Sequence, residues 1–322
     1  MALVVEQDEG VGWHMYCGDC IEVLRGLPDG RLHYSIFSPP FSSLYTFSDE
    51  PRDVSNNSDD ATFWQHFKFV IRELRRTIMP GRLVSVHCMQ LPTSKQRDGF
   101  IGLRDFRGEI IRAFQDEGFY YHSEVCIRKD PVSAMQRSKA IGLLHKQVAK
   151  DSSISRMAVA DYIVTMRSQG DNPEPIEGRL DSYYGDDMTD AEHTAAVLGD
   201  FDRSRGRSWD DHKSISVWQR YAEPIWLDIA QSDVLSHRLA REVEDERHIS
   251  PLQLTVIRRC VQLWTNPGDV VFSPFAGIGS AGYVATEMGR KFIGVELKRS
   301  YYNQAVDNIR TAERERDVRR LL

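Results

Sequence analysis

The sequence predicts an α/β fold in which helices cover a mostly parallel β-sheet. Strand-like and helix-like segments alternate over residues 1–129 and again from residue 248 onwards, which is the pattern of such sheets. Residues 270–296 add the order strand, glycine-rich loop, helix, strand and acidic residue. The chain of 322 residues is longer than one hydrophobic core usually serves, so we expect one domain with a sizeable insert or two unequal domains.

The first part, residues 1–129, contains three strand-like and two helix-like segments. Apolar residues recur at helical spacing between Phe63 and Ile78, and Pro80-Gly81 is expected to end that helix. The double proline at 39–40 must stop the strand before it, because proline has no N–H to give to a sheet. The expected strands are 32–37, 82–88 and 119–127, and the expected helices are 63–78 and 107–117.

The last part, from residue 248, repeats this alternation. Pro267-Gly268 marks a turn before the strand 269–273, and residues 274–279 form a tight glycine-containing loop. The expected helices are 252–264, 280–288 and 300–310, the last extended by the polar tail to Leu322, and the second strand is 291–296.

The middle part, residues 130–247, is less regular and changes in charge along its length. Residues 124–167 carry eight basic and four acidic side chains, a net charge of +4, whereas residues 171–202 are acidic and rich in Gly, Pro and Asp. We expect this acidic stretch to be a flexible or partly disordered loop. The aromatic residues of 209–226 predict a packed segment.

Composition excludes several classes of protein. The formal net charge of −6 argues against binding nucleic acid by bulk charge alone, although a local basic face remains compatible with it. Five scattered cysteines favour a reducing compartment, and Cys17 with Cys20 has only half of the ligands of a zinc site, so no metal is expected. The N-terminus does not have the pattern of a signal peptide, and no apolar run is long enough to span a membrane.

The glycine-rich loop predicts a ligand that contains adenosine. Gly277 and Gly279 allow a tight turn and a close approach of the backbone to a ligand. Glu296 follows Gly277 by nineteen residues, at the end of the next strand, where an acid can accept hydrogen bonds from ribose hydroxyls. Because Gly282 completes a G-x-G-x-x-G pattern, this motif alone leaves nicotinamide or flavin binding open. It is also compatible with a plain glycine turn.

A second motif, Ser38-Pro39-Pro40-Phe41, predicts a site for an amine. Two prolines fix the backbone and remove two donors, which leaves carbonyl oxygens and the Ser38 hydroxyl as acceptors near one point. Such acceptors can bind both hydrogens of an exocyclic amine and favour a pyramidal nitrogen during its reaction. Phe41 can stack on a base taken out of a duplex. A proline turn beside a core phenylalanine is the alternative for this motif taken alone.

Together, these motifs resemble the DNA amino methyltransferases of the beta arrangement, in which the amine motif precedes the cofactor motif. The detail of the second half is most similar to orphan enzymes carried by phages and prophages. The matching segments are Tyr16-Cys-Gly-Asp-Cys-Ile-Glu-Val-Leu24 with Leu27-Pro28, Ser38-Pro-Pro-Phe41, Pro80-Gly-Arg-Leu-Val84, His248-Ile-Ser-Pro-Leu252, Asn266-Pro-Gly-Asp-Val-Val-Phe-Ser-Pro-Phe-Ala-Gly-Ile-Gly279 and Gly289-Arg-Lys-Phe-Ile-Gly-Val-Glu296.

The resemblance implies a Rossmann-like, seven-stranded, mostly parallel methyltransferase sheet with helices on both faces. Residues 1–129 would form the half that holds the target amine, 130–247 a target-recognition insert, and 248–322 the half that binds S-adenosylmethionine together with the C-terminal helix. It implies that Ser38, Pro39, Pro40 and Phe41 form the catalytic site. The implied cofactor residues are Asp19, Cys20, Ser273, Phe275, Ala276, Gly277, Gly279 and Glu296.

Two residues depart from the family pattern. Ser38 stands where adenine enzymes usually have Asp or Asn, and is more typical of enzymes that act on cytosine N4. The frequency of adenine enzymes among orphan and phage proteins favours adenine N6, which is the target we expect, with cytosine N4 as the alternative. Ser273 stands where the family usually has an acid near the ammonium group of the cofactor, so other groups must serve there.

The resemblance also implies double-stranded DNA as a partner, a homodimer, and a cytoplasmic enzyme at the nucleoid with no obligatory endonuclease. We expect base flipping and direct attack of the amine on the methyl group. In the basic stretch, the expected DNA contacts are Arg128, Lys129, Gln136, Arg137, Lys139, His145 and Lys146; a solvated basic face is the alternative. A nicotinamide- or flavin-dependent oxidoreductase, a methyltransferase for RNA or protein amines, and a non-catalytic DNA-binding relative are the competing functions.

Overall fold

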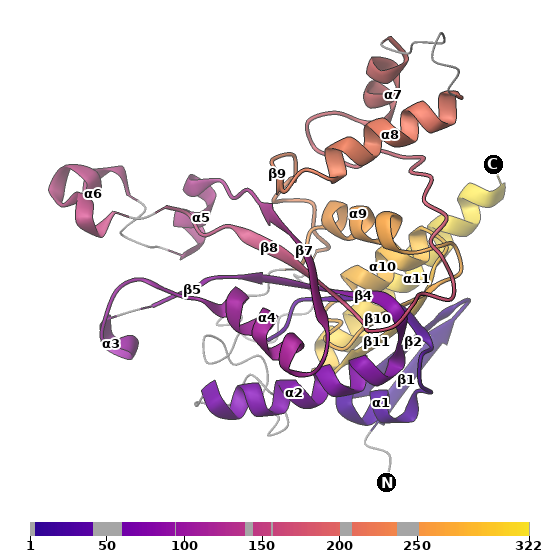
Figure 1. The fold of residues 1–322 in the computed structure, drawn as a ribbon, viewed down its shortest axis with the longest axis horizontal. Helices are drawn as coiled ribbons and strands as arrows, with labels where there is room; N and C mark the ends of the chain where they lie inside the picture. Colours follow the sequence, from indigo (N-terminus) through magenta and orange to yellow (C-terminus); the bar gives the residue numbers. More distant parts are fainter. Residues whose placement is uncertain are drawn as a thin grey trace.

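The computed structural model describes residues 4–40, 60–93, 95–138, 144–155, 157–199, 208–236 and 251–321. Within these residues the main sheet has nine strands in the order β1-β2-β11-β10-β3-β4-β8-β7-β9 (Figure 1). The strands are β1 (Val4–Gly10), β2 (Trp13–Gly18), β3 (Leu32–Phe37), β4 (Ile78–Met89), β7 (Tyr120–Ile127), β8 (Asp161–Arg167), β9 (Ile225–Trp226), β10 (Val270–Ser273) and β11 (Lys291–Glu296). A separate short hairpin pairs β5 (Leu91–Pro92) with β6 (Leu103–Arg104).

Most of the sheet is parallel. The five neighbouring strands β2, β11, β10, β3 and β4 run in one direction, and β8 runs antiparallel to both β4 and β7. The α/β fold class predicted from the sequence is therefore confirmed. The sheet has two strands more than the seven expected, because β1 pairs with the edge strand β2 and the two-residue β9 pairs with β7 at the other edge.

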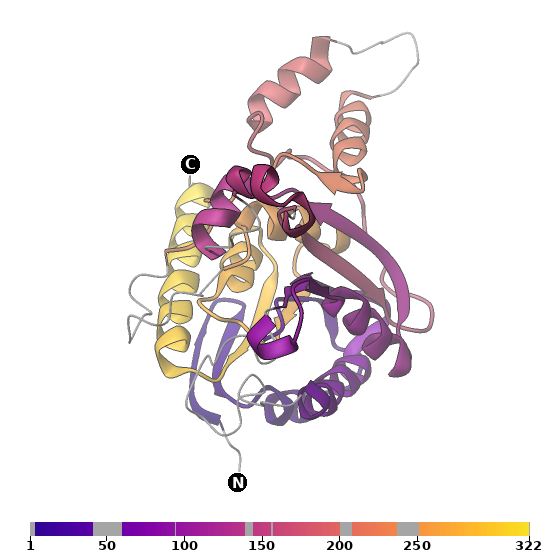
Figure 2. The ribbon, with the colours of Figure 1, turned by 90° about the vertical axis from the view of Figure 1, so that its left-hand side faces the viewer.

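Helices cover both faces of the sheet, and each face has its own apolar core (Figures 1 and 2). Helices α1 (Cys20–Gly26), α2 (Asp60–Thr77) and α4 (Phe106–Asp116) pack in one core. Helices α9 (Leu254–Trp264), α10 (Ser280–Glu287) and α11 (Arg299–Leu321) pack in the other. Successive residues of β10 serve the two cores in turn, since Val271 belongs to the second and Phe272 to the first. This burial on both faces explains why the parallel strands read as continuous apolar runs.

The junction between α2 and β4 differs from the sequence prediction. The helix ends at Thr77, whose hydroxyl donates to the Glu73 carbonyl at 2.7 Å, and the strand begins at Ile78. Pro80-Gly81 therefore lies inside the strand and does not end the helix. Gly81 has a φ of +71°, and a Cβ there would lie 2.6 Å from the backbone nitrogen of Asn172. A glycine at position 81 is therefore needed for this close approach of two chain segments.

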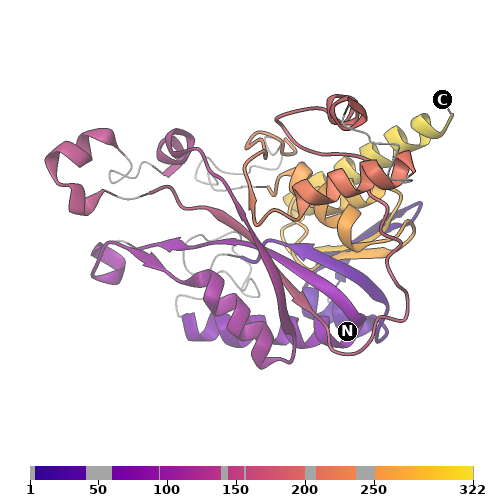
Figure 3. The ribbon, with the colours of Figure 1, turned by 45° about the horizontal axis from the view of Figure 1, so that its top comes forward.

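The segment predicted as the target-recognition insert, 130–247, contributes part of the sheet. Its residues 161–167 form β8 between β4 and β7, and Ile163, Val164 and Met166 are completely buried. From the sequence, residues 161–167 were expected to belong to the basic stretch of the insert, although their apolar run is typical of a strand buried on both faces. The insert is thereby divided. Helices α5 (Pro131–Ser138) and α6 (His145–Lys150) precede β8, whereas α7 (Asp190–Gly199) and α8 (Trp209–Tyr221) follow it (Figures 1 and 3).

The acidic stretch is more ordered than its composition predicted. Over residues 171–199 the chain buries Leu180 and Tyr183 against Val217 and Tyr221 of α8, and it then forms α7. Residues 200–202 lie outside the described residues. The expectation of a loop agrees with residues 171–189, which form no helix or strand although Leu180 and Tyr183 are buried there, whereas residues 190–199 form α7 instead.

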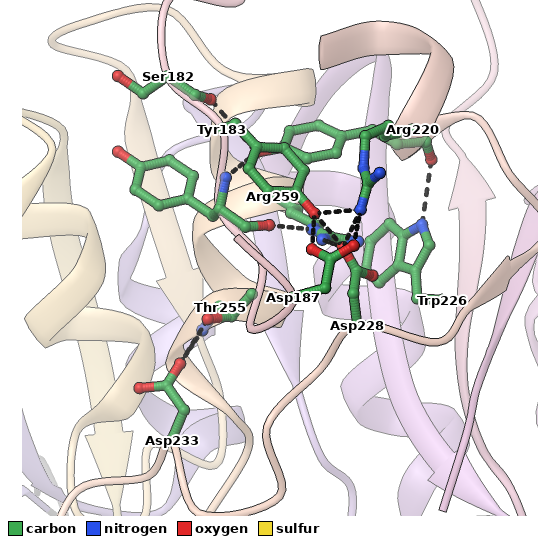
Figure 4. Close-up of polar contacts among 11 residues, drawn as sticks. Ser182, Tyr183, Asp187, Arg220, Trp226, Asp228, Asp233, Thr255 and Arg259 are labelled. Atoms are coloured by element: carbon green, nitrogen blue, oxygen red, sulfur yellow. Dashed lines mark hydrogen bonds and ion pairs between the residues drawn. The ribbon is translucent and has the colours of Figure 1, made fainter. Parts of the chain in front are cut away.

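A buried arginine joins this helical region to α9 (Figure 4). Arg259 of α9 has no exposed surface. Its guanidinium donates to the Tyr184 carbonyl at 2.7 Å and to the Asp228 carboxylate. The same guanidinium lies over the rings of Tyr221 and Trp226, 4.8 and 4.9 Å from their centroids. These contacts connect the insert to the half of the sheet that carries the glycine loop. Across the described ranges, every helix is too short or too polar to span a bilayer.

Candidate active site

The two predicted motifs meet at one edge of the sheet. β3, which precedes Ser38-Pro39-Pro40, and β10, which precedes the glycine loop, are parallel neighbours with Val271 opposite Tyr34. Both motifs therefore follow the carboxyl ends of adjacent strands. At these ends, the rings of Phe37, the last residue of β3, and of Phe275 lie 5.7 Å apart, edge to face. The proline motif and the glycine loop thus follow adjacent strands, at the edge where open α/β sheets bind their ligands.

The glycine loop is shaped by two residues with positive φ. Gly277 has a φ of +54° and Gly279 a φ of +85°. A Cβ on Gly279 would lie 2.9 Å from Cα of Ala305 in α11, so this glycine allows the loop to pack on the helix. A Cβ on Gly277 would meet none of the described atoms within 4 Å. Gly277 therefore faces open space, and a ligand can approach its backbone there.

Glu296 holds the loop from the neighbouring strand. One of its carboxylate oxygens accepts a hydrogen bond from the Gly277 N–H at 2.8 Å, and the other accepts from the Lys298 N–H at 2.9 Å. A carboxylate can accept about four hydrogen bonds, so the two hydroxyls of a ribose can join these backbone donors. The structure thus gives Glu296 a second role that the sequence did not reveal, which is to fix the conformation of the loop.

Asp19 and Cys20 lie at the same edge, because β2 pairs in parallel with β11 and Cys17 stands opposite Glu296. The Asp19 carboxylate caps α1 and accepts from the Ile21 N–H at 2.7 Å. Burial, with a further contribution from Asp19, raises the pKa of the Cys20 thiol. Cys20 is therefore a neutral thiol.

The other predicted cofactor residues are Ser273, Phe275 and Ala276, at the end of β10 and in the loop that follows it. Ser273 ends β10 and is buried, and the Ala276 N–H donates to the Val295 carbonyl at 2.8 Å. The Phe275 ring packs on Phe37 and also on Phe67, whose centroid is 6.3 Å away. The described residues together fit an adenosine-containing cofactor, since they offer an acid for the ribose and an open glycine backbone beside it.

At the amine site, the structure connects Ser38 to residues that the sequence did not identify. The Ser38 hydroxyl lies 2.8 Å from Nδ1 of His87, which is located in β4. Nε2 of His87 lies 3.2 Å from the Asp161 carboxylate, and the Lys129 ammonium lies 2.7 Å from the same oxygen. Pro39 is buried and Pro40 is partly buried beside Ser38. Phe41 lies outside the described residues.

The predicted DNA contacts fall into three groups. Arg128, Gln136, His145 and Lys146 are at least partly exposed, and the last three lie on α5 and α6, which project from the sheet between β7 and β8 (Figure 3). Lys129 is instead paired with Asp161 and only 17% exposed, so its charge is directed inward. Lys139 and the side chain of Arg137 lie outside the described residues.

A cluster at the opposite edge of the sheet has groups that can ligate metals. Nε2 of His33 lies 3.2 Å from Glu174 and 3.7 Å from Asp269. However, Nδ1 of His33 accepts a hydrogen bond from the Val270 N–H at 3.1 Å, so Nε2 carries the proton of the neutral ring. Asp269 also lies 3.1 Å from the buried guanidinium of Arg82. These contacts form a polar network, with one ion pair between Arg82 and Asp269, that joins the starts of β3 and β10.

Known proteins are similar to parts of this sequence. A family profile described as DNA methylase (N6_N4_Mtase) matches residues 32–307. The DNA adenine methyltransferase YhdJ of Escherichia coli (strain K12) is 36% identical over 69 residues, which are 21% of this chain and 24% of that protein. The Type II methyltransferase M1.MboII of Moraxella bovis is 40% identical over 58 residues, 18% of this chain and 22% of that protein. The chain thus matches about a quarter of the length of these curated relatives.

Solved structures share the fold over nearly the whole chain. TTHA0409 of Thermus thermophilus, described as a DNA modification methylase and solved with S-adenosyl-L-methionine, superposes with a TM-score of 0.60 at 20% identity, over 92% of this chain and 93% of that one. The cytosine-N4-specific PvuII DNA methyltransferase gives a TM-score of 0.58 at 16% identity, over 95% and 92% of the two chains. From the match of the family profile to most of its length, this chain belongs to the N6/N4 DNA methylase family.

Proposed function

We propose that this protein transfers a methyl group from S-adenosylmethionine to the exocyclic amine of a base in double-stranded DNA. The observation that carries the proposal is the placement of Ser38-Pro39-Pro40 and the Gly277 loop at the ends of adjacent parallel strands. Glu296, which bonds to the loop, adds an acceptor suited to ribose. Family membership and the cofactor complex of the Thermus protein support S-adenosylmethionine as the donor.

In this proposal the chain binds and orients both reactants. S-adenosylmethionine, when bound, supplies an activated methyl group attached to a sulfonium. Glu296 would bind its ribose, and the backbone at Gly277 would lie against its methionine part. The Ser38 hydroxyl and a carbonyl of the proline motif accept hydrogen bonds from the two amine hydrogens. These acceptors favour a pyramidal nitrogen, whose lone pair then forms the new bond to carbon, and so they stabilise the transition state more than the planar amine.

Adenine N6 is the target that we propose, with cytosine N4 as the second candidate. The adenine methyltransferase YhdJ is among the curated relatives, which supports adenine. Ser38 favours cytosine, because a serine at this position is the residue that the resemblance associates with N4 methylation. A single sequencing experiment distinguishes the two. Genomic DNA from a methyltransferase-deficient host that expresses the protein should contain N6-methyladenine at one sequence motif by single-molecule sequencing and nucleoside mass spectrometry. N4-methylcytosine would establish the second candidate, and unmodified DNA would contradict the proposal.

The exposed residues of α5 and α6 are proposed to contact DNA while the target base is flipped out. Their helices project from the carboxyl edge of β7, the edge at which the amine site lies. A duplex with 2-aminopurine at the target position should brighten on binding if the base leaves the stack. A duplex RNA of the same sequence should remain unmethylated.

In light scattering, the proposed homodimer should have twice the mass of the 37.0 kDa chain. Imaging of a fluorescent fusion should place it at the nucleoid.

A further inference from the structure

A chain of polar contacts lies behind Ser38 and connects four segments of the sheet. It runs from Ser38 at the end of β3 to His87 in β4, then to Asp161 at the start of β8, and then to Lys129 just after β7. His87 is 6% exposed and Asp161 is 1% exposed. Asp161 Oδ1 and His87 Nε2 are buried without a well-aligned hydrogen-bond partner in the described part of the chain. Buried polar groups are costly unless they interact, so this arrangement needs an explanation.

The charges in this series of polar contacts determine which nitrogen of His87 carries the proton. Burial disfavours the ionised form of Asp161, but contacts with His87 and with the Lys129 ammonium, 2.7 Å away, outweigh it and hold the pKa of that carboxyl below its usual value. When the ring of His87 is neutral, Lys129 is the cation that favours the ionised carboxylate. An ionised Asp161 faces Nε2 of His87 and favours a proton on that nitrogen. Nδ1 is then an acceptor, so the Ser38 hydroxyl must donate to it. The oxygen of Ser38 is left to accept a hydrogen bond from a substrate.

Ser, His and Asp also occur together in hydrolytic enzymes, in which the serine is the nucleophile, but their arrangement here is different. In hydrolytic triads the serine bonds to Nε2 and the acid to Nδ1, whereas here Ser38 lies at Nδ1 and Asp161 at Nε2. In addition, the two residues after Ser38 are Pro39 and Pro40, which have no N–H to form an oxyanion hole. Ser38 is therefore placed to accept and pass a proton.

We infer that His87 is a positioning residue that orients the Ser38 hydroxyl toward the target amine and takes its proton during methyl transfer, an inference that rests on the proposed function. As the nitrogen–carbon bond forms, the carbon–sulfur bond breaks and its electron pair stays on sulfur. The nitrogen becomes positive and gives a proton to Ser38 Oγ, while Ser38 gives its own proton to Nδ1 of His87. Asp161 stabilises the resulting imidazolium, which later returns its proton to solvent. Lys129 keeps Asp161 ionised between turnovers.

This role explains why a serine can serve at a position where related enzymes have Asp or Asn. The oxygen of a carboxylate or amide is always an acceptor. A serine hydroxyl rotates, and it presents its lone pairs to the amine only if its proton has another acceptor. His87 supplies that acceptor, so the dependence on His87 should be specific to Ser38.

The experiment compares single-turnover methylation by the wild type, His87→Leu and His87→Asn, with His193→Leu as the control. His193 is also buried and also lies within hydrogen-bond distance of a serine, Ser216 at 3.2 Å, but it is located in α7. Leu removes both nitrogens of His87, whereas the Asn amide can still offer an acceptor near the position of Nδ1. The rate with His87→Leu should fall by about 100-fold, the range for a lost proton transfer. His87→Asn should recover part of that rate, and His193→Leu should retain the wild-type rate.

Two further measurements separate positioning from a structural role. Binding of S-adenosylmethionine by calorimetry without DNA, and the melting temperature, should change no more in His87→Leu than in His193→Leu. Either a wild-type rate in His87→Leu or a parallel loss of cofactor affinity would overturn the inference.

Nitrogen-15 NMR of the imidazole rings tests the inference without any activity. His87 should show a protonated Nε2 and an unprotonated Nδ1 whose resonance shifts in Ser38→Ala. A ring protonated on Nδ1 would overturn the inference. If the wild type shows this tautomer but methylates no DNA, the proposed function fails while the hydrogen-bond arrangement stands.

Discussion

Arg259→Met should destabilise the protein by several kcal/mol, although Arg259 lies away from the predicted catalytic motifs. Methionine retains much of the apolar volume but removes the hydrogen bonds to the Tyr184 carbonyl and the Asp228 carboxylate. Hydrogen bonds from a charged group contribute about 1.5–3 kcal/mol each. Loss of the cation–π contacts with Tyr221 and Trp226 adds up to about 2 kcal/mol.

The expected total is reduced by a second arginine. Arg220 Nη2 lies 3.5 Å from the Asp228 carboxylate, so this carboxylate retains a positive partner in Arg259→Met. We therefore expect a loss of about 3–5 kcal/mol, the range for breaking a buried ion pair. Arg259→Lys keeps the positive charge but not the planar guanidinium group. This variant should be less stable by about 1.5–3 kcal/mol, the contribution of one hydrogen bond from a charged group.

Urea unfolding followed by tryptophan fluorescence measures these differences. The matched control is Arg179→Met, since Arg179 pairs with Asp210 and Asp211 but is 63% exposed; it should cost less than about 1 kcal/mol. A loss below about 1 kcal/mol in Arg259→Met, or an equal loss in Arg179→Met, would refute the assignment of Arg259 as the anchor of the helical insert.

Four other perturbations test the site, its surroundings and the pairing of Asp228. Glu296→Gln should weaken S-adenosylmethionine binding by about 10-fold or more, because its amide can accept only one of the two backbone hydrogen bonds and its NH₂ faces the other donor; unchanged calorimetric affinity would contradict this role. Gly279→Ala should lower the stability by about 2 kcal/mol or more, since its Cβ would lie 2.9 Å from Ala305 at a φ of +85°, and an unchanged melting temperature would show that the helix can move. Lys146→Glu should weaken DNA binding and reduce the salt slope by about 1, the amount expected for one phosphate contact, whereas an unchanged slope would remove α6 from the DNA interface. The stability that Asp228 contributes should be lost in acid. Arg259 and Tyr183 outweigh burial and lower the pKa of Asp228 in the folded protein. Its contribution is therefore present above the ordinary aspartate pKa of about 4 and disappears as the pH falls through the lower pKa of the folded state. The cost of Arg259→Met should therefore shrink in urea titrations below about pH 4, and a cost that is the same at pH 3 and pH 7 would contradict the pairing.

The sequence alone determined the features that depend on residues close together in the chain. The segment from Val270 to Glu296 contains a strand, a loop, a helix and a second strand in one continuous stretch of sequence. The elements of the predicted cofactor half could therefore be predicted almost one by one. The same holds for the proline motif, where Pro39 and Pro40 end β3 for a local reason. Right-handed parallel connections then leave few ways to arrange such units, and the meeting of the two motifs followed.

Only the tertiary structure decided which residues stand behind Ser38. His87 is 49 residues away in the sequence, and Asp161 reaches it only because β8 inserts antiparallel between β4 and β7. No local pattern distinguishes a histidine in an apolar strand that faces a serine from one that faces the core. In the same way, Lys129 resembled its basic neighbours, and the strand pairing alone turned it toward Asp161. Pairing between distant strands depends on the summed burial of the whole sheet, so the residues that it brings together cannot be inferred from any single segment.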